Sequence, residues 1–153
     1  MSTPFEIRLP RSDEYEPWLA LWEGYNAFYE RKGPTAVSEA VTRTTWGRFF
    51  DASEPVHCLV AAAGDRLIGL THYLYHRNTV MIGPTCYMQD LFTAPEARGR
   101  GVATALIQAV YARAREAGAP RVYWQTHETN LTAQRLYDTL AQRSGFIVYR
   151  KDL

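Results

Sequence analysis

The chain of 153 residues carries a formal net charge of +1, and 46% of its residues are hydrophobic and 22% charged. This length suffices for one continuous core and the composition is that of an ordinary folded protein, so we expect residues 1–153 to form a single domain. The near-zero net charge excludes a strong overall attraction to nucleic acid or to an anionic membrane.

The cysteines and the N-terminal residues indicate the compartment. Cys58 and Cys86 stand in apolar, strand-like segments, which is typical of core residues rather than of a disulfide framework. Residues 1–5 lack the basic and apolar regions of a signal peptide, and no apolar run approaches the ~20 residues of a membrane span. We therefore expect a soluble, cytoplasmic protein with no membrane partner.

The N-terminal part of the chain predicts one strand and two helices. Residues 5–9 alternate apolar and polar side chains, as a half-buried strand does. Ser12 and Asp13 are candidate caps of a helix that extends to Gly33-Pro34, and Ser38 caps a second helix. The first helix carries an aromatic stripe with two open interpretations, a buried core face or one wall of an acceptor site. The stripe consists of Trp18, Leu21, Trp22, Tyr25 and Tyr29.

The chain beyond Pro55 predicts a run of strands and then alternating helices and strands. Gly64-Asp65 is a turn signal between two β-rich runs, so a hairpin is expected there. An antiparallel meander followed by strand-helix-strand-helix-strand indicates a mixed sheet with helices packed on it, in the α+β or α/β class. The expected strands cover 56–63, 66–75, 85–93, 121–126 and 146–151, and the expected helices cover about 100–117 and 130–141.

One turn between an expected strand and an expected helix has the pattern of an anion site. Gly99 and Gly101 leave room for a phosphate where the first N–H groups of the helix lack partners, and Arg98 and Arg100 add charged donors. A dinucleotide fingerprint needs a third glycine where Thr104 stands, and a P-loop needs Gly-Lys-Ser/Thr, so neither pattern fits. We expect a pyrophosphate ligand.

This region resembles the acetyl-CoA signature of the GNAT N-acetyltransferase superfamily. The signature is carried by Arg98-x-x-Gly101-x-Ala103, and by Asp90-Leu91-Phe92-Thr93-x-Pro95 upstream of it. The resemblance continues through Asn130, Ala133, Leu136-Tyr137 and Gly145-Phe146, so it covers the C-terminal half closely.

The N-terminal half is similar to one subgroup, the histone- and polyamine-acetylating enzymes first described in yeast. This similarity is carried by Trp22-x-x-Tyr25 and by His127-Glu128-Thr129-Asn130. The chain departs from the family pattern after Tyr137, because residues 138–144 separate this tyrosine from Gly145-Phe146. The departure puts the last helix-strand connection, and a dimer built from it, in doubt.

The resemblance implies a fold, a ligand and a set of contact residues. The fold is a mixed sheet of about six to seven strands flanked by about four helices, and the cosubstrate is acetyl-CoA, with no metal. Backbone groups of the strand are expected to pair with the pantetheine arm, and a bulge near Leu91 would present N–H groups to an oxyanion. Asn130 has two open interpretations, a hydrogen bond to the same arm or the N-cap of the next helix. The expected cofactor-binding residues are Leu91, Phe92, Thr93, Arg98, Gly99, Arg100, Gly101, Val102, Ala103, Thr104, Asn130 and Tyr137.

Acetyl transfer from a thioester to an amine needs a neutral nucleophile and an acid for the leaving thiolate. An alkylamine of pKa ~10.4 is only roughly one part in a thousand neutral at pH 7. Asp90 and Glu128 are the nearest acids, acting through water or by attracting the cationic acceptor, a role assigned mainly to Glu128; Asp90 has a structural alternative. Tyr137 fills the family position of the general acid, with a core aromatic residue as the alternative.

The expected reaction is direct attack of a primary amine on acetyl-CoA in a ternary complex. The acceptor classes are a small amine, a polyamine or an exposed lysine, and a basic amine is preferred because of Asp90, Glu128 and the aromatic rings. The rival is a non-catalytic acyl-CoA sensor on the same fold. The apolar segment 146–149 predicts a homodimer. His72 and His76 stand about 13 Å apart along a strand, so no shared zinc is expected.

Overall fold

The computed structural model describes residues 3–153, which form one five-stranded sheet in the order β1-β2-β3-β4-β5. Strands β1 to β4 run antiparallel to their neighbours, whereas β5 runs parallel to β4 because α3 carries the chain across the sheet between them. The strands are β1 (Glu6–Arg8), β2 (Val56–Ala63), β3 (Arg66–His76), β4 (Thr85–Thr93) and β5 (Arg121–Tyr123).

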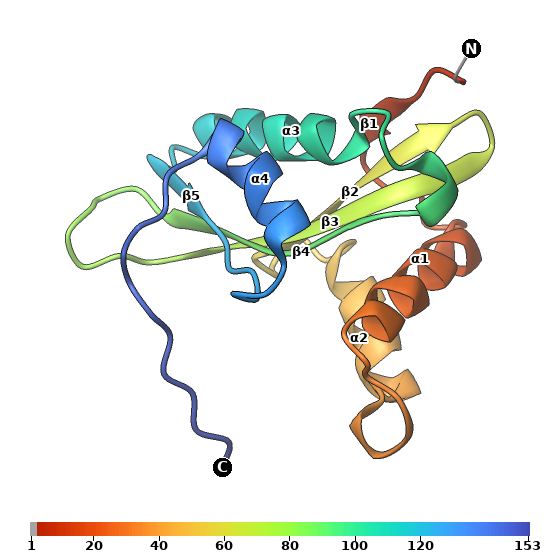
Figure 1. The fold of residues 1–153 in the computed structure, drawn as a ribbon, viewed down its shortest axis with the longest axis horizontal. Coiled ribbons are helices and arrows are strands. Elements are labelled where there is room, and N and C mark those ends of the chain that lie inside the picture. Colours follow the sequence, from red (N-terminus) through yellow and green to blue (C-terminus); the bar gives the residue numbers. More distant parts are fainter. Residues whose placement is uncertain (1–2) are drawn as a thin grey trace.

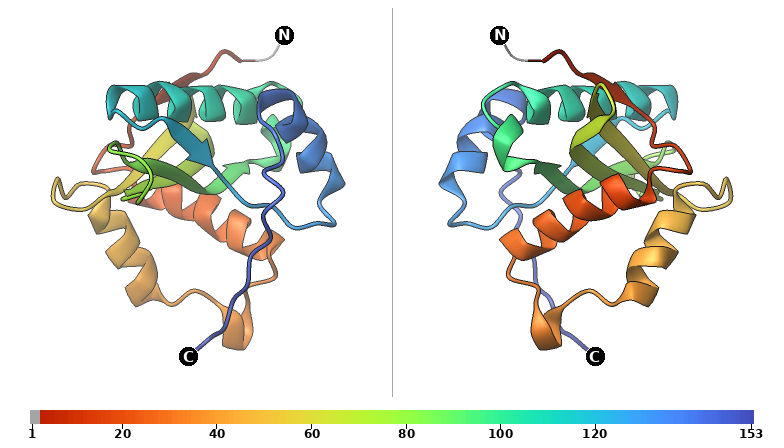
Figure 2. Two further views of the ribbon diagram at one scale, coloured as in Figure 1. Left: turned by 90° about the vertical axis from the view of Figure 1, so that its left-hand side faces the viewer. Right: turned by 90° about the vertical axis from the view of Figure 1, so that its right-hand side faces the viewer.

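The helices lie on both faces of this sheet. Figures 1 and 2 show α3 across one face and α1 with α2 on the other, while α4 lies beside the end of the sheet that carries β5. Two short 3-10 helices, η1 (Gly33–Thr35) and η2 (Pro95–Ala97), connect the longer elements. The α-helices are α1 (Tyr15–Phe28), α2 (Glu39–Arg48), α3 (Val102–Glu116) and α4 (Leu131–Leu140).

Two apolar helix faces build the core against the sheet. On α3, which confirms the helix expected at about 100–117, the fully buried side chains recur at helical spacing. On α1 the aromatic stripe is buried at Trp18, Leu21, Trp22 and Tyr25, whereas Tyr29 just beyond the helix is 38% exposed. The core interpretation of the stripe therefore holds for all but its last residue.

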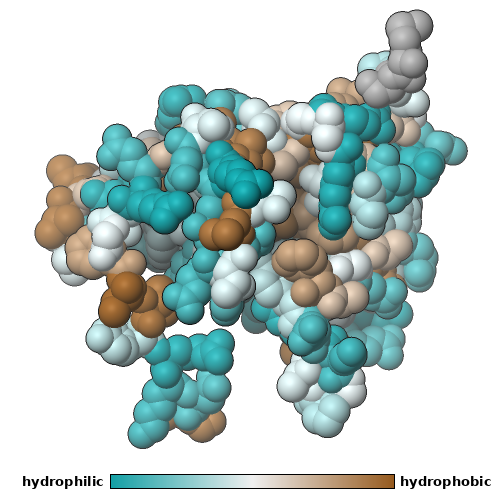
Figure 3. All heavy atoms as spheres, viewed as in Figure 1, coloured by the Kyte–Doolittle hydropathy of each residue, from teal (hydrophilic) through white to brown (hydrophobic). Residues whose placement is uncertain are grey.

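The expectation of six to seven strands was wrong, because the residues described form five. The alternating segment 146–151 has the composition of a strand but pairs with no strand of residues 3–153, and an unpaired strand is not stable alone. The segment leaves α4 away from the sheet (Figure 1), and Figure 3 shows brown, hydrophobic side chains on it. Phe146 is 91% and Tyr149 is 90% exposed.

Two smaller expectations also needed correction. Neither Ser12 nor Asp13 caps α1: Glu14 takes the N-cap position without a side-chain cap, and its carboxylate accepts a 2.6 Å hydrogen bond from Arg8 instead. Ser38 does cap α2, since its hydroxyl accepts from the Val41 N–H at 3.2 Å. Strand β5 ends at residue 123 rather than 126.

Residues 3–153 lack two further features. None of the helices in this range is long and apolar enough to cross a membrane. Nor does the same range bring together three His, Cys, Asp or Glu side chains in a group that could hold a metal ion.

Candidate active site

Strands β4 and β5 separate after a short pairing. Thr85 to Tyr87 pair with Arg121 to Tyr123, and beyond Tyr87 the strand β4 continues to Thr93 with only β3 beside it in the residues described. The edge of β4 that faces β5 therefore has no strand partner from residue 88 to residue 93. Such an edge can accept an extended ligand by backbone hydrogen bonds, as was expected of Leu91 and Thr93.

A β-bulge lies in this open part of β4. The register between β3 and β4 shifts between His72 and Tyr73, because His72 is opposite Asp90 while Tyr73 is opposite Met88. Gln89 is thus the extra residue on β4, two positions before Leu91. The sequence predicted a bulge here from the family resemblance alone.

The turn between η2 and α3 forms an open cradle beside the end of β4. Gly99 and Gly101 have φ of 76° and 79°, and a Cβ atom at either position would meet no atom within 4 Å. Gly101 occupies the N-cap of α3 and offers no side-chain acceptor, so the first-turn N–H groups of residues 102 to 104 lack a side-chain partner. The Val102 side chain is buried in the core, which leaves only its backbone to face a ligand. The cradle fits a phosphate group.

The two arginines of this turn contact protein groups. Arg98 donates from Nε to the carbonyl of Thr93 at 3.4 Å, and its guanidinium lies 5.9 Å from the centre of the Phe92 ring. Arg100 donates to the carbonyl of Thr3, and its Nε atom is buried without a hydrogen bond. Both side chains therefore stand at the cradle without being committed to a carboxylate.

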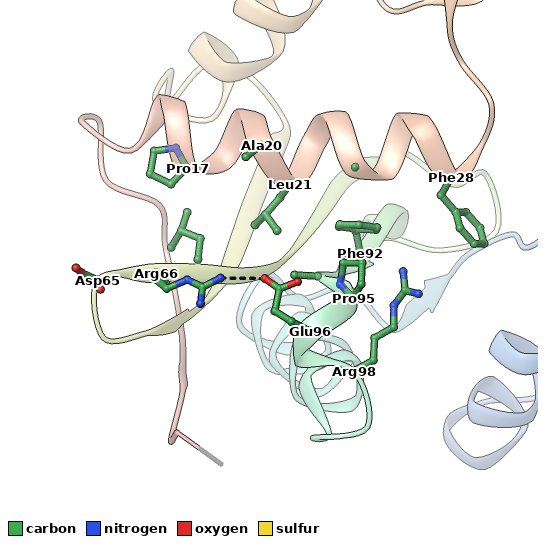
Figure 4. Close-up of a pocket in the computed structure, with 13 residues that line it drawn as sticks. Pro17, Ala20, Leu21, Phe28, Asp65, Arg66, Phe92, Pro95, Glu96 and Arg98 are labelled. Atoms are coloured by element: carbon green, nitrogen blue, oxygen red, sulfur yellow. Dashed lines mark hydrogen bonds and ion pairs between the residues drawn. The ribbon is translucent and has the colours of Figure 1, made fainter. Parts of the chain in front are cut away.

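A cavity of about 510 Å³ lies between α1 and the segment from β4 to η2 (Figure 4). Phe92, Phe28 and Arg98 line one part of it, and the ion pair between Arg66 and Glu96, 2.9 Å long, lines another. None of Asp90, Glu128 or Tyr137 lines this cavity, so it is separate from the groups expected to act on the acetyl group.

On the α1 side of β4, a hydrogen-bond chain holds Asp90. Trp18 Nε1 lies 3.1 Å from His72 Nε2, and His72 Nδ1 lies 2.8 Å from Asp90 Oδ2; all three residues are buried. Because an indole N–H only donates, His72 Nε2 must accept, and the proton of this neutral imidazole is assigned to Nδ1. His72 therefore donates to the Asp90 carboxylate. Sequence reasoning missed this pairing.

Tyr25 lies near Asp90, and Tyr29 lies near Tyr137. Burial, and to a smaller extent the nearby negative charge of Asp90, raises the pKa of the Tyr25 phenol far above its usual range. The rings of Tyr25 and Tyr29 lie 4.9 Å apart. Burial, followed by the proximity of Tyr29, raises the pKa of Tyr137 to about 12. The phenol of Tyr137 therefore stays protonated at physiological pH.

The segment after β5 brings one aromatic residue against Tyr137 and carries three polar side chains. Trp124 packs edge-on against its ring, with centroids 5.4 Å apart. The Thr126 hydroxyl is buried and makes no hydrogen bond, so it is a polar group free to meet a ligand. Asn130 accepts from the Ala133 N–H at 3.3 Å, which confirms the N-cap interpretation and leaves its amide NH₂ free to donate. Glu128 is exposed, and within residues 3–153 its carboxylate has no hydrogen bond or ion pair.

Comparison with known proteins identifies this arrangement. The model of the acetyltransferase (GNAT) family matches residues 18–141. The chain belongs to the GNAT family. It is an acetyl-CoA-dependent acyltransferase by this membership.

Two relatives and one solved structure extend the comparison. The D-amino-acid N-acetyltransferase HPA3 of Saccharomyces cerevisiae is 36% identical over 140 residues, covering 90% of this chain and 84% of the yeast protein. The thialysine N-epsilon-acetyltransferase of Caenorhabditis elegans is 30% identical over 105 residues, 65% of each chain. The aminoglycoside N-acetyltransferase AAC(6')-Iy in complex with CoA shares the GNAT fold, with a TM-score of 0.81, 20% identity and coverage of 100% and 98%.

Proposed function

We propose that this enzyme transfers the acetyl group of acetyl-CoA to the primary amine of a small molecule, by direct attack in a ternary complex. The observation that carries the proposal is the opening between β4 and β5. One end of this opening has the uncapped start of α3, and the segment after β5 brings Trp124 against Tyr137. A phosphate cradle, an open strand edge and a protonated phenol are the parts that the reaction needs.

Backbone groups of the chain bind the cosubstrate and stabilise the oxyanion. Backbone N–H groups at residues 102–104 bind the pyrophosphate, and backbone groups of Leu91 and Thr93 pair with the pantetheine arm. The cosubstrate supplies the activated thioester. N–H groups beside the bulge at Gln89 stabilise the oxyanion, since bulges turn such groups out of the ladder.

Proton movement is assigned to two groups. Tyr137 donates a hydrogen bond to the departing thiolate, and its pKa of about 12 means that it stabilises the sulfur by hydrogen bonding before it transfers the proton. Asp90 attracts the ammonium form of the acceptor, while water removes the proton, because one oxygen of this carboxylate is already held by His72. Glu128 adds negative charge from the exposed turn before α4.

The acceptor belongs to the small amines. The yeast and nematode relatives are named for a D-amino acid and for thialysine, both of which are small molecules that carry amino groups. The formal net charge of +1 gives no strong overall attraction for the many positive charges of an extended basic tail. We place polyamines and single exposed lysines behind small amines in this ranking.

An acceptor panel tests the proposal. Purified protein is mixed with acetyl-CoA and individual amines, thiol release is followed with a chromogenic reagent, and the product mass is measured. Release of CoA together with an N-acetylated product supports the enzyme. Tight binding of acetyl-CoA without thiol release from any acceptor would instead support a non-catalytic sensor.

We also propose that the enzyme is a homodimer joined through its C-terminal segment. Residues 146–149 expose four apolar side chains between 65% and 91%, and β5 has a free edge at the end of the sheet. A segment of strand-like sequence with no partner in its own chain can become a strand on the edge of a second copy.

A further inference from the structure

Arg31 stands where the chain turns back at the end of α1. The Glu30 N–H donates to the carbonyl of Ala27 at 3.0 Å, and the Arg31 N–H donates to the carbonyl of Asn26 at 2.9 Å. This is the bond pattern of a Schellman turn, in which the residue with positive φ is normally glycine. Here it is Glu30, with φ of 56°, so the chain adopts an unfavourable backbone conformation that directs Arg31 back over the helix.

The guanidinium of Arg31 is held by contacts on the side that faces the protein, and its outer side is free. It donates to Asn26 Oδ1 at 3.0 Å, and the buried Asn26 is itself anchored by a 3.0 Å bond to the carbonyl of Trp22. It also lies over the rings of Tyr25 and Tyr29, 5.6 and 5.1 Å from their centres. Within residues 3–153 no carboxylate lies within ion-pair distance of it. Most of its five N–H donors therefore remain available.

Arg43 shows what a satisfied arginine of the same kind looks like in this molecule. Its guanidinium lies 4.8 Å from the centre of the Tyr15 ring, much as Arg31 lies over its tyrosines. However, Arg43 also forms an ion pair with Glu39 at 2.9 Å. Both arginines thus lie on aromatic rings, but Arg43 on α2 is paired with an acid, whereas Arg31 at the end of α1 is not.

The unpaired cation shares an aromatic wall with the groups expected to act in catalysis. Tyr25 reaches the negative charge of Asp90, and Tyr29 is close enough to Tyr137 to influence its phenol. The wall therefore has an anion at its buried end and a fixed cation at its exposed end. An acceptor with one positive and one negative group is complementary to this arrangement, whereas a polyamine would be repelled by the cation.

We propose that Arg31 binds a carboxylate of the acceptor, so that the substrate class is amino acids rather than simple amines or polyamines. This inference rests on the proposed acetyl transfer to a small amine. A guanidinium forms two parallel hydrogen bonds with a carboxylate, which gives orientation as well as attraction. The amino group of the same molecule then points along the tyrosines towards Asp90. The preference for a basic amine expected from the sequence thereby narrows to amines that also carry a carboxylate.

The test compares acceptors that differ only in the carboxylate. Both enantiomers of phenylalanine are compared with phenethylamine, both enantiomers of methionine with 3-(methylthio)propylamine, and putrescine represents the diamines. The wild-type enzyme should acetylate one enantiomer of each amino acid with a higher kcat/KM than the matching amine. Arg31→Gln should lower kcat/KM for the amino acids by roughly 10- to 100-fold, mainly through KM. It should not lower kcat/KM for the amines, and putrescine should gain because the repelling cation is removed. Arg31→Lys should retain part of the preference, because it keeps the charge and loses the paired geometry.

Arg43→Gln is the matched control, since it removes an arginine that lies on a tyrosine but already has an acidic partner. It should leave the ratio of amino acid to amine unchanged. Two results would overturn the role of Arg31 and leave the acetyltransferase activity standing. One is a ratio of kcat/KM for amino acid over matching amine that Arg31→Gln does not change. The other is faster turnover of putrescine than of any amino acid. Failure of every acceptor to release CoA would overturn both proposals.

Discussion

His72 Nδ1 lies 2.8 Å from Asp90 Oδ2 on the buried side of β4, and the two residues are directly opposite each other in the β3–β4 pairing. The bulge at the preceding position of β4, Gln89, makes this possible, because it shifts the register between His72 and Tyr73. One oxygen of Asp90 is therefore occupied by an N–H donor. This position favours attraction of a cation by Asp90 over direct removal of a proton.

The His72 bond should be important for stability. His72→Phe leaves the Trp18 N–H and a buried carboxylate without partners, so the free energy of unfolding should fall by about 2–5 kcal/mol. Asp90→Asn keeps an acceptor for His72 and should cost only about 1 kcal/mol, while it lowers kcat/KM for amines. His76→Phe is the control, because His76 bonds to Tyr123 at an exposed position. Urea denaturation measures all three, and equal losses for His72→Phe and His76→Phe would contradict the assignment.

The glycine cradle predicts a charge effect on CoA binding. Gly101→Asp places a carboxylate at the start of α3, where it repels the pyrophosphate, whereas Gly101→Asn has the same size and tolerates the positive φ of 79° but is neutral. By calorimetry, the aspartate variant should bind acetyl-CoA more weakly than the asparagine variant, by on the order of tenfold or more. Equal affinities would show that the pyrophosphate does not bind at the glycine cradle.

The sequence predicted those parts of the fold that depend on local patterns. The α3 face, the Ser38 cap and the hairpin at Gly64-Asp65 follow from periodicity and turn chemistry that act within a few residues. The strand expected at 146–151 does not form, because alternation shows that a segment can form a strand but does not show whether it will pair with another strand of the same chain.

The same distinction between local and long-range features applies to the candidate site. The cradle at Gly99 and Gly101 was predictable because the motif and the helix start adjoin in sequence. The pairing of His72 with Asp90 was not, because it depends on the register of two strands, and a shift of one residue changes every partner. Arg31 gave no signal either, since an exposed arginine after a helix is ordinary until the structure shows that it has no acidic partner.

Tyr137→Phe tests the general acid. The variant keeps the ring against Trp124 and removes the proton, so kcat should fall about 10²- to 10⁴-fold while acetyl-CoA binding is unchanged. Since the pKa of Tyr137 is raised to about 12, the active protonated form is lost only above that pH. Wild-type kcat/KM should therefore rise with pH as the amine loses its proton, without a descending limb from Tyr137 below about pH 11. A loss of kcat below about fivefold would make Tyr137 a core residue.

The last prediction concerns the C-terminal segment. Light scattering at tens of micromolar should give the mass of two chains, because the apolar residues 146–149 have no partner in their own sheet and the free edge of β5 can accept a strand from a second copy. Ile147→Asp places a charge in the middle of the segment and should shift the mass to that of one chain. Ile82→Asp is the matched control: Ile82 is fully exposed in the turn between β3 and β4, so its replacement should leave the dimer intact. A monomeric wild-type protein, or a dimer that only Ile82→Asp disrupts, would show that the segment is not the interface.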